Sequence, residues 1–117
     1  NNHNGFTSSG NRIIYSGRTV STNNPNTYRN CEVRYNLSVG NNLTFQNICF
    51  IIIKNGNEVI RSSFSKQTIP SAGAFYSVSC CSYVQMNIND YVEVWCGNQT
   101  TTGNIDCVAF SLTIRGL

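Results

Sequence analysis

The chain has 117 residues, of which 40% are hydrophobic and 11% are charged, and its formal net charge is +3. This length suits one domain with enough apolar residues for a sandwich core, and the scattered basic residues disfavour nucleic-acid binding. No run of about 18 apolar residues occurs, which excludes membrane insertion through an apolar helix.

The N-terminus begins Asn1-Asn2-His3-Asn4-Gly5, without an initiator Met or a signal-peptide pattern. We predict that residues 1–10 are the flexible remnant of a longer chain with an upstream stalk. Residues 11–117 are predicted to form the folded domain, beginning with a short strand at residues 12–15.

Apolar residues then recur at every second position, which is typical of strands with one solvated face. Residues 31–39 show this alternation best, and their apolar face carries Cys31, Val33, Tyr35, Leu37 and Val39. Residues 48–53 are apolar at every position, so this strand should be covered on both faces. The second cover would be a neighbouring subunit or a loop.

Asn55-Gly56 supplies the two positive φ angles of a type I′ turn and predicts a hairpin between residues 48–53 and 58–64. A long strand follows, whose core face carries Tyr76, Val78, Cys80, Val84 and Met86. Residues 21–30, 71–73, 87–90 and 97–104 are predicted loops or turns. With about seven or eight strands, the predicted fold is an all-β jelly-roll β-sandwich of two antiparallel sheets.

The order of three segments resembles a known family. They are the hairpin at residues 51–60, the NDYVEVW run at residues 89–95 and the alternating strand at residues 108–114. This order is similar to the jelly-roll head of the tumour necrosis factor ligands and of the first complement component. The resemblance spans residues 31–117 and implies a trimer that binds a partner and does no chemistry. Similar heads lie at the tips of viral and phage fibres.

The chain departs from this family in its short N-terminal part and in its six cysteines, Cys31, Cys49, Cys80, Cys81, Cys96 and Cys107. No C-x-x-C spacing occurs, so no metal site is predicted. The six allow 15 disulfide pairings, and buried free thiols are an equal alternative that suits Cys49 best. Cys80 and Cys81 should point to opposite faces of one strand and therefore not pair.

Catalytic residues are not predicted. The only histidine is His3, and the five acidic residues are dispersed along the chain. General acid and base chemistry needs such groups within hydrogen-bonding reach of one another. We therefore expect neither an enzyme nor a cofactor.

Four aromatic residues lie opposite the predicted core positions on two strands: Phe75, Tyr83, Tyr91 and Trp95. As a subunit interface they would use the large area and low entropy loss of such side chains. They could instead cover a sheet edge or form the other half of the core.

The loop at residues 97–104 is the candidate contact surface for a receptor or glycan, because loops on a rigid scaffold carry recognition. Its candidate residues are Asn98, Gln99, Thr100, Thr101, Thr102 and Asn104.

The sequence hypothesis is a receptor-binding or adhesive head of a trimeric viral or phage fibre, at the virion surface or extracellular. Its partners would be two further copies in a homotrimer and a host-surface receptor protein or glycan, bound through multivalent attachment. Two alternatives stay open: a secreted cytokine-like or complement-like trimeric ligand, and a monomeric carbohydrate-binding module.

Overall fold

The computed structural model describes residues 2–3, 6–9, 12–21, 24–26, 28–40, 46–100 and 105–117. Every regular element in these ranges is a strand. The strands are β1 (Asn2–His3), β2 (Phe6–Ser9), β3 (Arg12–Tyr15), β4 (Arg18–Ser21), β5 (Asn24–Asn26), β6 (Tyr28–Gly40), β7 (Gln46–Lys54), β8 (Glu58–Ile69), β9 (Phe75–Asn87), β10 (Tyr91–Asn98) and β11 (Asp106–Gly116). Among the described residues, no helix is long and apolar enough to span a membrane.

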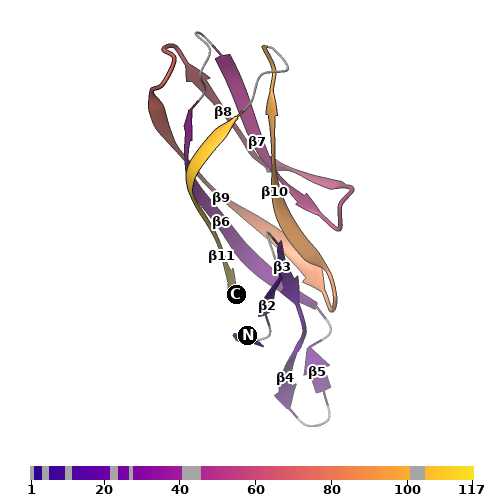
Figure 1. Ribbon diagram of the computed structural model, residues 1–117. Helices are drawn as coiled ribbons and strands as arrows, with labels where there is room; N and C mark the ends of the chain where they lie inside the picture. Colours follow the sequence, from indigo (N-terminus) through magenta and orange to yellow (C-terminus); the bar gives the residue numbers. More distant parts are fainter. Residues whose placement is uncertain are drawn as a thin grey trace.

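Two antiparallel sheets of unequal size pack face to face (Figure 1). In the described chain the larger sheet has six strands in the order β1-β2-β3-β10-β7-β8, and the smaller has three in the order β11-β6-β9. Strands β4 and β5 form a separate two-stranded ribbon. The predicted all-β sandwich of two antiparallel sheets is confirmed.

Strand β6 is the centre of the smaller sheet, and the alternation predicted for residues 31–39 is confirmed. Its inward side chains are all buried: Cys31, Val33, Tyr35, Leu37 and Val39. The inward side chains of β9 include buried Val78, Val84 and Met86, with Cys80 packed partly against the same core. The predicted core face of this long strand is therefore correct.

Tyr35 links the centre of β6 to an irregular stretch of β8. Its buried hydroxyl group donates to the Ser63 carbonyl oxygen at 2.7 Å and lies 2.8 Å from Ser65 Oγ. The Ser63 hydroxyl in turn accepts from the Ile52 N–H at 2.7 Å and donates to the Ile60 carbonyl oxygen at 2.6 Å. Burial raises the pKa of Tyr35 to about 12, against an opposing effect of the Ser65 hydrogen bond.

We expect Tyr35→Phe to destabilise the fold by about 1–3 kcal/mol, because the buried Ser63 carbonyl group loses a hydrogen bond. The raised pKa means that Tyr35 stabilises the fold below about pH 10 and that this contribution is lost as the pH rises towards about 12. Urea unfolding at pH 7 to 12 measures both effects, with exposed Tyr83→Phe as control. Parallel alkaline profiles for wild type and Tyr35→Phe would contradict this role.

A cluster around Asp90 joins the turns at one end of the sandwich. Asn55 Nδ2 donates to Asp90 Oδ1 at 2.9 Å, the Asn87 N–H donates to Oδ2 at 2.8 Å, and Lys54 Nζ lies 3.4 Å from Oδ2. The Tyr15 N–H of β3 donates to the Asp90 carbonyl oxygen at 2.9 Å. Partial burial opposes ionisation, but the hydrogen bonds and the Lys54 charge together lower the pKa of Asp90. The Asp90 carboxylate therefore ties the β7–β8 turn to the β9–β10 turn, and the Asp90 backbone carbonyl joins the second turn to the end of β3.

Asp90→Asn should lower the free energy of unfolding at pH 7 by about 1–3 kcal/mol, because a charged acceptor is lost. A lowered pKa means that the wild-type contribution is present above the ordinary carboxyl pKa of about 3.9 and is lost as the pH falls through the folded pKa. The variant should therefore lose less stability in acid. Chemical unfolding from pH 7 to 2 tests this, with exposed Asp106→Asn as the control that keeps the wild-type acid profile.

The predicted hairpin between β7 and β8 is confirmed, with φ of 56° at Asn55 and 75° at Gly56. Within the predicted N-terminal remnant, β1 and β2 lie at residues 2–3 and 6–9, and the buried Phe6 ring is 5.3 Å from the Tyr15 ring. The boundary after residue 10 and the flexibility before it stay predictions. One predicted loop needs correction. The predicted loop at residues 21–30 contains β5 and the start of β6.

Two apolar strands differ in how far they are covered. On β7, Ile53 is buried within the single chain, between Glu93 and Val59 in register on the flanking strands. Cys49 and Ile51 on the same face are half-buried, and the second cover predicted for this strand stays a prediction. On β11, Phe110 is 46% exposed although it faces inward, because β11 is the edge strand of the smaller sheet.

Candidate functional site

The outer face of the smaller sheet carries a row of small polar side chains. Residues in register on neighbouring strands point to the same side of a sheet. Two such rows cross β11, β6 and β9, and together they form what we call the serine face: Ser111, Asn36 and Ser79 in one row, and Ala109, Ser38 and Ser77 in the next.

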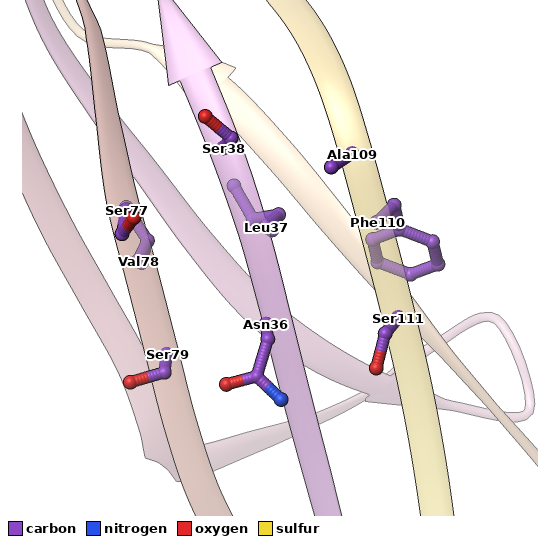
Figure 2. A pocket seen from close by; sticks show the side chains of 9 residues that line it. All are labelled: Asn36, Leu37, Ser38, Ser77, Val78, Ser79, Ala109, Phe110 and Ser111. Atoms are coloured by element: carbon purple, nitrogen blue, oxygen red, sulfur yellow. The ribbon is translucent and has the colours of Figure 1, made fainter.

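A hollow of about 410 Å³ lies on the serine face. Its lining consists of the six residues of the two rows and of Leu37, Val78 and Phe110, which lie between the rows on the same strands. Because no residue of the facing sheet lines the hollow, we assign it to the outer face. Figure 2 shows the hydroxyl groups of Ser79 and Ser111 and the amide of Asn36 on three adjacent strands. A second hollow of about 320 Å³ shares Asn36 and Ser79 and extends to Arg34. The two hollows meet at Asn36 and Ser79, and together we call them the trough.

The polar groups of the serine face are not used within the fold. Asn36, Ser38, Ser77, Ser79 and Ser111 make no side-chain hydrogen bond to any residue that the structure describes. Each hydroxyl offers a donor and an acceptor, and the amide offers both. Because the strands hold these groups on a rigid sheet, they are available to a polar ligand at low entropic cost.

Aromatic rings stand at both ends of this face. Phe75 is 47% exposed and pairs with Gly40, where an added Cβ would come within 2.7 Å of the ring. Gly40 therefore allows the Phe75 ring to approach β6 closely. Tyr83, 65% exposed, lies eight residues further along β9, about 26 Å away along a strand. Several small rings of a ligand would fit between the two.

Charged residues lie at the Tyr83 end of the serine face. Glu32 accepts from Arg34 at 3.4 Å and from Arg115 at 3.0 Å. Two guanidinium groups share one carboxylate, so this end carries a net positive charge. Arg34 also lines the trough, which makes it the residue best placed to meet an anionic group.

The predicted contact loop lies elsewhere, and its described part is tied to β7. Asn98 Nδ2 donates to Gln46 Oε1 at 3.0 Å, and Thr100 Oγ1 accepts from the Asn47 N–H at 2.8 Å. The Gln99 N–H donates to the Asn47 carbonyl oxygen at 2.8 Å. Thr101, Thr102 and Asn104 lie outside the described residues. The loop as a binding surface stays a prediction.

The four candidate interface aromatics divide between two surfaces. Phe75 and Tyr83 lie on the outer face of the smaller sheet, whereas Tyr91 and Trp95 lie on the outer face of the larger one. They therefore form two patches rather than one, and the subunit interface stays a prediction.

The patch on the larger sheet is held together by a short polar chain. Arg12 stacks 4.1 Å above the Tyr91 ring and pairs with Glu93 at 3.1 Å. Trp95 Nε1 donates to the other oxygen of Glu93 at 3.2 Å. Glu93 is buried, and these two partners compensate for its burial. The Trp95 ring remains 47% exposed.

The six cysteines are free thiols in the structure. Cys80 faces the core and Cys81 faces outward, as predicted. Within the described residues, no group of three or more His, Cys, Asp and Glu side chains could hold a metal ion.

Sequence reasoning missed the serine face. Its signal is present as alternating small polar residues in three segments around residues 36–38, 77–79 and 109–111. Each segment alone is typical of the solvent-exposed face of any strand. Only the pairing of β6 with both β9 and β11 brings them together.

No protein-family model and no curated protein matches the sequence. One solved structure to which the chain is similar is Xyl-CBM35, a carbohydrate-binding module, in complex with a disaccharide containing glucuronic acid. The TM-score is 0.39 and the identity 20%, over 99% of this chain and 84% of that chain. A likeness of this size identifies neither a family nor a ligand for this chain.

Proposed function

We propose that this domain is a non-catalytic carbohydrate-binding module that holds a glycan in the trough of the serine face. The observation that carries the proposal is the row Ser111, Asn36 and Ser79, whose polar groups are unpaired within the described chain and border a hollow of about 410 Å³. Of the binding roles that the sequence leaves open, this row favours the carbohydrate-binding module.

The chemistry of the trough matches that of a sugar. A glycan presents many hydroxyl groups, each able to donate and accept, and serine and asparagine side chains offer the same pair of functions. Sugar rings also present apolar C–H faces, and exposed aromatic rings such as Phe75 and Tyr83 provide flat surfaces against which they can pack. A sheet that holds these groups in place needs little ordering on binding.

The charge at the Tyr83 end indicates which glycans are favoured. Arg34 lines the trough, and the two guanidinium groups at Glu32 leave a positive excess. A guanidinium group binds carboxylates through paired hydrogen bonds. Oligosaccharides with a uronic acid should therefore bind more tightly than neutral ones, and added salt should narrow the difference.

The triple variant Ser111→Ala, Asn36→Ala, Ser79→Ala tests the site. Three lost hydrogen bonds at about 0.5–1.5 kcal/mol each should weaken binding at least about tenfold. Because the three side chains are exposed, stability should change by no more than about 0.5 kcal/mol per site. A glycan array identifies a ligand of the wild-type domain. Calorimetric titration with that ligand then measures the affinity of the wild type and of the triple variant.

The matched control is Gln99→Ala combined with Thr100→Ala, which alters the loop instead of the trough. Loss of binding in this control with full binding in the triple variant would move the site to the loop. If the wild-type domain binds no glycan of the array, the proposal is wrong.

A second candidate function, the head of a trimeric fibre, is favoured by exposed apolar side chains on the larger sheet. Val59, Phe64 and Trp95 are each about half exposed there, and apolar patches of this kind often mark interaction sites. Light scattering at micromolar concentration should then give three times the mass of one chain, and Trp95→Ala should lower that mass. A monomer would exclude the trimeric head and leave the carbohydrate-binding proposal intact.

A further inference from the structure

Two of the six cysteines lie on different sheets, each in register with a residue of the core. Cys96 on β10 is in register with Phe50, and Cys107 on β11 is in register with Val39. Phe50 and Val39 are both buried core residues. Because residues in register share a face, both thiols point into the space between the two sheets, from opposite sides.

The two positions also lie at the same rim of the sandwich. Strand β10 ends and strand β11 begins at the end of the molecule where β7 begins and β6 ends (Figure 1). Ile105, just before β11, packs against the core. Both thiols are exposed, so a reagent in solution can reach them.

The other four cysteines are placed differently. Cys49 lies on the outer face of β7, in register with Gly97, and its thiol is 3.5 Å from the Gly97 carbonyl oxygen. The sheet backbone therefore lies between Cys49 and Cys96. Cys31 and Cys80 are further into the core, and Cys81 is on the outer side of β9.

We propose that Cys96 and Cys107 form a disulfide that joins the two sheets at this rim. Partial burial raises the pKa of the Cys96 thiol, and Cys107 and then Cys49 raise it further. The effect of Cys107 agrees with the closeness of the two thiols that the strand registers indicate. The raised pKa also means that the reaction needs mildly alkaline conditions, since the thiolate is the reactive form.

The oxidant is a small-molecule disulfide such as oxidised glutathione. One cysteine thiolate attacks a sulfur of the oxidant, which releases one glutathione thiolate and leaves a mixed disulfide. The second cysteine thiolate then attacks the protein sulfur of that bond and releases the other glutathione. Two protein thiols lose two electrons, the oxidant gains them, and the two released thiolates take up the two protons.

The bond would also change the shape of the rim. Packed sheets stand about 10 Å apart, whereas a disulfide holds the two Cα atoms roughly 4.4–6.8 Å apart. Its formation should therefore draw the start of β11 towards β10. Because β11 is the exposed edge of the smaller sheet, the oxidised form should be the more stable one.

Proteolysis before aspartate gives a direct test, because Asp90 and Asp106 are the only aspartates. Cleavage there puts Cys96 in a peptide of residues 90–105 and Cys107 in one of residues 106–117. The native protein is incubated with oxidised glutathione at mildly alkaline pH, free thiols are alkylated, and the digest is analysed by mass spectrometry without reduction. We expect the two peptides as one linked species and a higher Tm than for reduced protein.

Matched variants give the controls. Cys96→Ser and Cys107→Ser should each lose the linked species and the redox-dependent shift in Tm, while Cys81→Ser should keep both. Linkage of the 90–105 peptide to residues 1–89 would overturn the proposal, since the partner of Cys96 would then be one of the four cysteines before Asp90. Separate glutathione adducts on Cys96 and Cys107, or no reaction of the native protein, would overturn it as well.

Discussion

The fold depends on strand β6, which alone gives the smaller sheet a fully buried centre. Its inward residues from Cys31 to Val39 are almost completely covered, and Tyr35 adds a buried hydrogen bond to β8 in the facing sheet. In the described chain β6 has only β9 and β11 beside it, whereas the facing sheet has six strands. The smaller sheet therefore has an edge strand directly beside its central strand on each side.

The small number of strands in this sheet accounts for the exposure of β11, which is one of its edges. Its inward residues alternate as those of β6 do, but the edge position leaves Phe110 partly in contact with solvent. The same exposure leaves Cys107 open to reagents, although its register with Val39 directs it towards the inside of the sandwich. An edge strand with apolar inward residues is a weak point of a sheet. A covalent link near the first residue of β11 would stabilise the strand where its inward residues are most exposed.

Sequence patterns predicted those parts of the fold that depend on local chemistry. The alternation in β6 and β9 and the positive φ angles at Asn55 and Gly56 are of this kind. Burial of Phe6 could not be predicted, because a single aromatic residue in a polar segment shows no period. The serine face could not be predicted either, since it requires the pairing of residue 36 with residues 79 and 111, and sequence spacing does not determine which strands become neighbours.

The same pairing is the reason why we propose the sheet, rather than the loop, as the recognition surface. Asn98 and Thr100 use their side-chain oxygen and nitrogen atoms to fasten the loop to β7, so a ligand there would have to displace internal hydrogen bonds. On the serine face a ligand would displace only water, and the side chains stand on strands whose backbone is already ordered. Because net affinity is what remains after such costs, the groups left unpaired within the described chain support our proposal of a binding site on the sheet, even though each of them is small.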